Sequence, residues 1–171
     1  MVRELADWIQ STRLNHVVRD ATWLVPTSQA IHIVCVAIVL GSTIMISFRL
    51  LGVMQPTRSV AQLVDTLIPW MLRAVAVLLL TGVVQTVAEP RRELLAGVFW
   101  LKMAMVLCAV IVTVWFATTV RRNTASWSDA GGTRIPAQAR IFALVSLVLW
   151  AGIVICGRLI AYSWLLHPQR G

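Results

Sequence analysis

The chain has 171 residues and a formal charge of +8, but 58% of its residues are hydrophobic and only 13% are charged. Soluble domains usually have about a quarter of their residues charged, so this composition and a mean hydropathy of +0.80 exclude a soluble fold. The basic residues lie mostly between or at the ends of apolar runs, where they set membrane topology and contact lipid head groups; they do not indicate nucleic-acid binding.

Residues 1–22 predict an amphipathic segment that lies in the membrane interface. Val2, Leu5 and Ile9 recur at helical spacing, and the charged residues lie largely elsewhere around that helix. Trp8 is then expected at head-group depth. Because the segment lacks the apolar core and cleavage site of a signal peptide, the first span is expected to act as an uncleaved signal anchor.

Four apolar runs follow, and each is long enough as an α-helix to cross a hydrocarbon layer about 30 Å thick. The predicted spans and the tail after them are residues 24–48, 67–87, 98–119, 141–164 and 165–171. The chain is therefore predicted to be an all-α membrane protein, a four-helix transmembrane bundle preceded by an interfacial helix. Residues 50–66 are expected to form a loop, which puts both Pro26 and Pro69 in the first turn of a span, where proline is tolerated.

One face of the first span is predicted to point into the bundle, because small and polar side chains recur along it at intervals of three or four residues. These residues are Ser28, His32, Cys35, Val39, Ser42 and Ile46. In the last span, Gly152 with Cys156 and Gly157 with Ala161 form small pairs at four-residue spacing, which predict close contact with a neighbouring helix.

Four spans place both chain termini on the same side of the membrane. The arginines near the span ends are equally numerous on the two sides, so they do not decide the orientation. Acidic residues such as Glu4, Asp7 and Glu93 lie on the side of the termini. They favour a periplasmic location for the termini, in a bacterial inner membrane.

Polar side chains converge in one half of the predicted bundle. Antiparallel spans bring the start of spans one and three and the end of spans two and four to the same membrane face, so His32, Gln85, Lys102 and Arg158 lie in the same half of the bilayer. Ionisable groups at such depth are costly and often functional. We expect Arg158, which follows a small glycine, to face the bundle close to His32 or Gln85.

Three interpretations of this polar set stay open. Each cation can extend separately to the head groups while His32 is a hydrogen-bonded packing residue. The set can hold a haem b, with His32 as an axial iron ligand, Met103 or Met105 as the second ligand, and Lys102 and Arg158 on the propionates. It can also hold the head group of a quinone or of an anionic lipid.

No catalytic motif occurs in the chain, which lacks HExxH, CxxC, GxSxG and P-loop sequences. The cysteines Cys35, Cys108 and Cys156 fall in separate apolar runs and form neither a disulfide framework nor the close-spaced ligand pairs of a soft-metal site. We therefore expect a protein that is not an enzyme on its own.

The predicted function is that of an accessory or anchoring subunit in a larger membrane assembly, in contact with lipid and with other membrane subunits or copies of itself. The alternative is an electron-transfer subunit that binds haem b or quinone at His32. A small transporter is a second alternative, although the half-broken helices typical of transporters are not evident in the sequence.

Short motifs occur in a fixed order along most of the chain. They are Trp23-Leu-Val-Pro-Thr-Ser-Gln-Ala-Ile-His32, Gly41-Ser42, Arg49-Leu-Leu-Gly52, Pro69-Trp70, Thr81-Gly82, Phe99-Trp-Leu-Lys102, Trp150-Ala-Gly152 and Gly157-Arg-Leu-Ile-Ala-Tyr162. Together they resemble a family of small bacterial four-helix integral membrane proteins of unknown function. The resemblance implies a four-helix fold and motif positions for His32, Lys102 and Arg158, but no activity.

The chain departs from that family at Ser47, where the family often has an aspartate two residues before the arginine of its Arg-Leu-Leu-Gly motif. Any ion role attached to that aspartate is not expected here. A more distant similarity to the copper-resistance D type of membrane protein rests on the arrangement of the spans.

Overall fold

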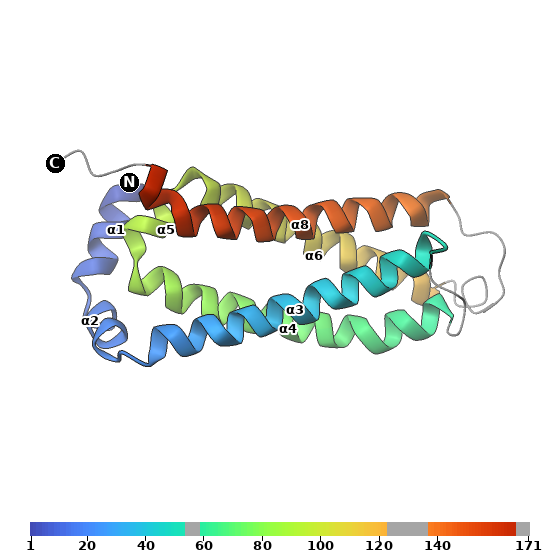
Figure 1. Cartoon of the computed structure of the whole chain (residues 1–171), viewed down its shortest axis with the longest axis horizontal. Coiled ribbons are helices and arrows are strands. Elements are labelled where there is room, and N and C mark those ends of the chain that lie inside the picture. Colours follow the sequence, from blue (N-terminus) through green and yellow to red (C-terminus); the bar gives the residue numbers. More distant parts are fainter. Residues whose placement is uncertain (54–58, 123–136, 167–171) are drawn as a thin grey trace.

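A computed structural model of the chain describes residues 1–53, 59–122 and 137–166, except for the side chains of residues 137 and 161–166. The described residues are helical apart from short connections (Figure 1). The helices are α1 (Val2–Ser11), α2 (Arg13–Asp20), α3 (Leu24–Leu50), α4 (Val60–Ala88), α5 (Pro90–Leu94), α6 (Gly97–Arg122) and α8 (Ala137–Leu166). The predicted polar loop between the third and fourth spans, and most of the predicted tail, lie outside the described residues.

Four of these helices, α3, α4, α6 and α8, are long and apolar enough to cross a membrane, which confirms the predicted all-α four-span fold. They form a ring in which α3 packs against α4 and α8, and α6 packs against α8 and α4. The diagonal pairs, α3 with α6 and α4 with α8, do not pack directly on each other within the described part of the chain. The bundle is thus built from two helical hairpins, α3/α4 and α6/α8.

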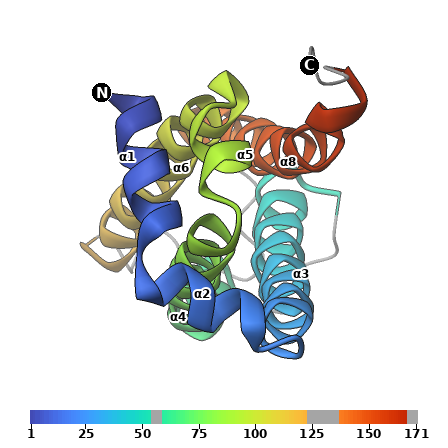
Figure 2. The same ribbon diagram turned by 90° about the vertical axis from the view of Figure 1, so that its left-hand side faces the viewer.

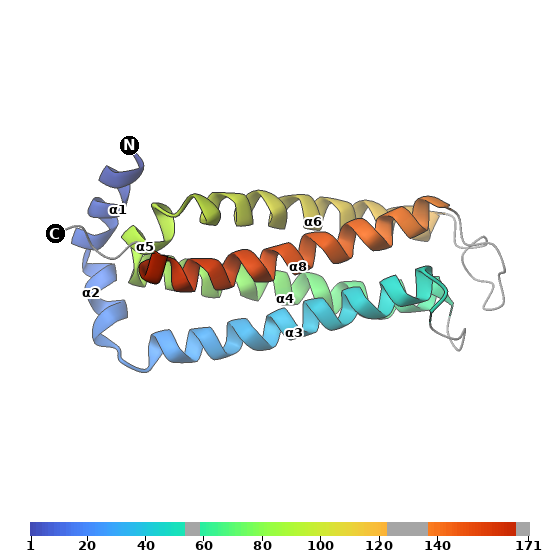
Figure 3. The ribbon, with the colours of Figure 1, turned by 45° about the horizontal axis from the view of Figure 1, so that its top comes forward.

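The two hairpins pack tightly at one end of the bundle and diverge toward the other (Figures 1 and 3). The buried residues of α6 all lie in its second half, from Ala109 to Val120. At this tight end the rings of Phe116 and Phe142 stack with their centroids 3.8 Å apart. At the end that carries α1, α2 and α5, side chains between the hairpins are therefore only partly covered.

The predicted start of the second span is wrong, because α4 begins at Val60, within the expected loop 50–66. Ser59 caps the helix: its hydroxyl accepts a hydrogen bond from the Gln62 amide at 3.2 Å, and the Gln62 side chain accepts one from the Ser59 amide at 3.1 Å. Pro69 consequently lies inside α4, in contrast to Pro26, which lies in the first turn of α3 as expected. The guanidinium of Arg73 lies 5.2 Å from the centroid of the Trp70 ring.

The N-terminal segment forms two short helices, α1 and α2, instead of the single helix that its periodicity suggested, and they cross the end of the bundle (Figure 2). Thr12 separates them and caps α2 by accepting a hydrogen bond from the Asn15 amide. Asn15 is 1% exposed, and its side-chain amide donates to the Val87 carbonyl at 2.7 Å. This bond satisfies a carbonyl at the C-terminal end of α4, which has no partner within its own helix.

The short connection between the second and third spans contains the helix α5. It begins with Pro90 in its first turn. Arg91 binds Asp7 of α1 at 2.7 Å, and Arg92 pairs with Glu89. These ion pairs hold α5 against the N-terminal segment and direct its next turn back toward the bundle.

Candidate functional site

The predicted inward face of the first span is confirmed. Ser28, Cys35, Val39, Ser42 and Ile46 are buried, whereas His32 is only half-buried. This difference follows from the divergence of the hairpins at the α5 end, where the side chains between them are less covered.

His32 is held by Thr81 across the α3/α4 contact. The distance from His32 Nδ1 to Thr81 Oγ1 is 2.8 Å, and Thr81 Oγ1 also lies 2.9 Å from the Val77 carbonyl oxygen. A threonine hydroxyl has one hydrogen, and Thr81 donates it to this carbonyl. Thr81 must then accept from His32, so the network assigns the ring hydrogen to Nδ1 and a lone pair to Nε2.

Lys102, the only lysine in the chain, projects from α6 between the hairpins. Its ammonium nitrogen lies 3.8 Å from the position that a Cβ atom would occupy at Gly157 on α8. Its charge is close enough to interact electrostatically with both His32 and Glu93. Lys102 therefore brings a hydrogen-bond donor to the region of His32 from a helix that does not pack directly on α3.

Glu93 is a member of this region that the sequence analysis missed. Burial raises the pKa of the Glu93 carboxyl, while the positive charges of Lys102 and Arg92 oppose the rise and Glu89 adds to it. The sequence interpretation counted Glu93 as a loop charge that offsets nearby arginines. Pro90, a favoured first residue of a helix, was the available sign that a helical turn would carry Glu93 back toward the bundle.

Gln85 lies one turn beyond Thr81 on α4 and is half-buried. Its amide nitrogen is buried without a hydrogen-bond partner among the described residues. A buried amide N–H that is not bonded to protein is costly, so Gln85 adds a second donor beside His32.

Arg158 does not occupy the expected position. The residue is exposed at the surface of the bundle, and its neighbour Gly157 is the one that faces Lys102. Successive residues of an α-helix point about 100° apart, so only one of this pair can face Lys102. The expectation that Arg158 is enclosed in the bundle is therefore wrong.

The two candidate second ligands of a haem differ in their surroundings. Met103 is 37% exposed. The methyl group of Met105 packs into the space that a side chain at Gly152 would need, and this contact, with the Lys102–Gly157 approach, confirms the predicted close packing of these glycines. Among the described residues, no three His, Cys, Asp or Glu side chains are grouped so that they could hold a metal ion.

The fold and this region define a multi-pass membrane protein, with four candidate membrane-spanning helices and a half-buried polar site between two helical hairpins. The chain belongs to a family of unknown function, DUF6644, whose sequence model matches residues 6–163. The comparison with curated proteins and the comparison with solved structures gave no match.

Proposed function

We propose that this protein binds the head group of a quinone beside His32 and serves as a non-catalytic quinone-binding subunit of the bacterial inner membrane. The observation that carries the proposal is the hydrogen bond between His32 and Thr81, which leaves His32 Nε2 as a hydrogen-bond acceptor. Within the described residues, no protein group bonds this nitrogen. A quinol hydroxyl can donate to Nε2, and a quinone carbonyl can accept from Lys102 or Gln85.

The surroundings favour a neutral head group over an anionic one. Glu93 lies close enough to Lys102 to offset part of its charge, which weakens the attraction of the region for a phosphate. The divergence of the two hairpins at this end (Figure 3) offers a lateral route for a lipid-soluble molecule. Small-molecule sites combine apolar walls with a few placed polar groups, and His32, Gln85 and Lys102 supply those groups here.

The haem alternative receives less support from the same region. A haem held in a helical bundle usually has two axial ligands. Of the two candidate sulfurs, that of Met103 belongs to an exposed side chain, and that of Met105 is committed to the contact with Gly152. The haem reading therefore has one suitable ligand, His32, where it needs two.

Equilibrium binding of a short-chain ubiquinone to the purified protein in lipid nanodiscs tests the proposal. His32→Ala and Thr81→Val should each weaken binding about tenfold, the loss expected for one hydrogen bond of roughly 1.4 kcal/mol. Thr86→Val is the matched control, because Thr86 lies on the same helix and donates to the Gly82 carbonyl, not to His32. Equal affinity in all four proteins would refute the quinone site. A Soret band that His32→Ala removes would support haem instead.

We also propose that the protein acts within a larger assembly, as an accessory or anchoring subunit whose termini face the periplasm. The first half of α6 supports this proposal, because every buried residue of α6 lies in the second half and the first half is available to a partner helix. Native mass measurement after gentle extraction should show a complex or an oligomer. A strictly monomeric particle, or C-terminal fusions active only in the cytoplasm, would contradict the respective parts.

Two other possibilities have weaker support. A copper-related role, as the distant similarity to copper-resistance D proteins suggests, would require converging soft ligands, but Cys35, Cys108 and Cys156 lie on three different helices and Cys108 is exposed. A transporter would be expected to have interrupted helices. Although Pro69 lies inside α4, that helix continues from Val60 to Ala88.

A further inference from the structure

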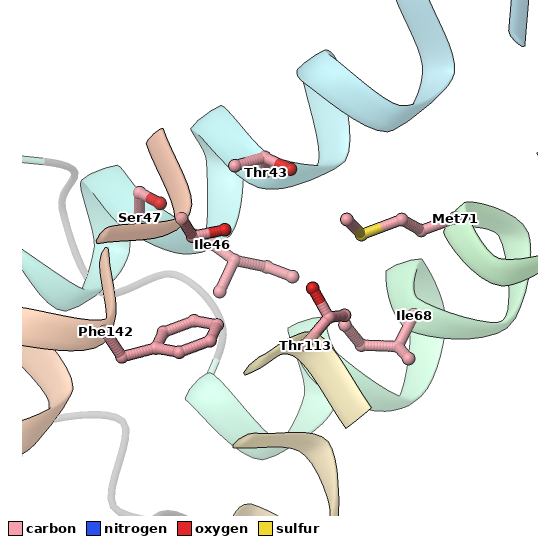
Figure 4. Close-up of a pocket in the computed structure, with 8 residues that line it drawn as sticks. Thr43, Ile46, Ser47, Ile68, Met71, Thr113 and Phe142 are labelled. Carbon is pink, nitrogen blue, oxygen red and sulfur yellow. The ribbon is translucent and has the colours of Figure 1, made fainter. Parts of the chain in front are cut away.

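A second polar feature lies in the tight half of the bundle, away from His32. It is a cavity of about 10 Å³ to which all four spanning helices contribute (Figure 4). Four of its lining residues carry a hydroxyl group: Thr43 and Ser47 from α3, Thr113 from α6 and Ser146 from α8. None of the lining residues is charged.

Two of these hydroxyls have no hydrogen-bond partner among the described residues. Thr43 is 3% exposed and Thr113 is 2% exposed, and the Oγ1 atom of each is buried. Hydroxyls in membrane helices commonly bond to the carbonyl of the preceding turn, as those of Ser42, Thr81 and Thr86 do here. Thr43 and Thr113 do not make this bond, and Figure 4 shows the Thr113 hydroxyl directed toward the space between Ile46 and Met71.

We propose that the cavity binds one ordered water molecule that bridges Thr43 Oγ1 and Thr113 Oγ1. A cavity of this size accommodates a single water and not an organic ligand, and a buried water needs two to four polar partners. The two threonines supply two partners, and Ser47 and Ser146 supply further oxygen atoms at the same cavity. Water is favoured over a cation because the lining offers no carboxylate to balance a positive charge.

The proposed water joins two helices that do not otherwise meet. Thr43 belongs to α3 and Thr113 to α6, a diagonal pair that does not pack directly within the described part of the chain. A bridge across this diagonal ties the α3/α4 hairpin to the α6/α8 hairpin. It would hold the tight half closed while the half that contains His32 stays open.

The sign of a stability change tests the proposal. In nanodiscs, Thr113→Val should lower the midpoint of thermal unfolding by about 2–4 °C, because the water loses one hydrogen-bond partner. If the cavity is dry, the same substitution replaces an unpartnered hydroxyl by a methyl group, and the midpoint should rise or stay unchanged, which would overturn the proposal. Thr118→Val is the control on the same helix, because that exposed hydroxyl already bonds to the Trp115 carbonyl.

Two further measurements exclude other causes of a loss. The double variant Thr43→Val/Thr113→Val should lose less than the sum of the single variants, since one water serves both hydroxyls; strict additivity would contradict the bridge. Radiolytic labelling generates hydroxyl radicals from bound water, so Met71, which is 2% exposed and lines the cavity, should be oxidised in the wild type and several-fold less in the double variant. Unfolding that depends on sodium rather than choline would identify a cation and overturn the water assignment.

Discussion

The imidazole of His32 donates a hydrogen bond from Nδ1 to the hydroxyl of Thr81, at 2.8 Å, because Thr81 gives its own hydrogen to the Val77 carbonyl. A single residue on α4 thus sets which nitrogen of a histidine on α3 carries the lone pair. The chemistry available at the open end of the bundle depends on this bond.

The first prediction is that His32 exists mainly as the Nδ1–H tautomer and that Thr81→Val removes the preference. Nitrogen NMR of histidine-labelled protein distinguishes the two tautomers, and comparison with His32→Ala identifies the signal among the three histidines of the chain. Thr86→Val should leave the signal unchanged. A dominant Nε2–H tautomer in the wild type would contradict the assigned network.

The second prediction concerns Glu93 and pH. Because the pKa of Glu93 is raised in the folded protein, the folded state holds the proton more tightly than the unfolded state does. Its contribution to stability is therefore complete below the usual value of 4.5 and is lost as the pH rises through the raised value. Relative to Glu93→Gln, the wild type should become less stable across this window when thermal unfolding is measured at a series of pH values.

Lys102 provides an internal check on that result. Its charge opposes the rise in the Glu93 pKa, so Lys102→Met should move the window to higher pH. A wild-type profile parallel to that of Glu93→Gln at every pH would show that the Glu93 carboxyl is not desolvated.

The third prediction distinguishes two glycines of the spans. Gly152→Val should destabilise the protein by about 1–3 kcal/mol, as overpacking does, because the new side chain competes with the methyl group of Met105. Gly152→Ala should cost less, since the end of a methionine side chain moves easily. Gly41→Val is the control, because nothing lies within 4 Å of a Cβ atom there. Equal unfolding midpoints for the two valine variants would disprove the close α6/α8 contact.

The fourth prediction concerns the docking of the N-terminal helices. Asn15→Leu should cost about 1–3 kcal/mol because it leaves the Val87 carbonyl unpaired in a buried position. Amide hydrogen exchange in α1 and α2 should then become faster, whereas His16→Ala, at an exposed neighbouring position, should leave it unchanged. Unaltered exchange in Asn15→Leu would mean that other contacts dock the segment.

Much of the fold was predictable from the sequence because burial in lipid constrains composition strongly. The four apolar runs and the small and polar stripe from Ser28 to Ile46 identified the spans and the inner face of the first one. The start of α4 was missed because Gln62 and Asp65 extend the helix beyond the apolar run, and polarity alone does not separate such a turn from a loop. The capping pair of Ser59 and Gln62 was the local signal for it.

The candidate site was less predictable than the fold. Antiparallel order alone brought His32 and Lys102 into the same half of the bundle, as expected. The side of the helix on which a residue lies depends on packing, so it was Gly157 and not Arg158 that faced Lys102. Glu93 could not be placed from its position in the sequence, because α5 reverses the chain direction within a few residues.

The position of the single lysine makes the open end of the bundle chemically addressable. Apart from the amino group of Met1, the Lys102 side chain is the only primary amine of the chain, and it is half-buried near His32. A lipid-soluble acylating reagent would therefore attach at one internal position, and a fluorescent or photoreactive label could be introduced there without engineering a cysteine.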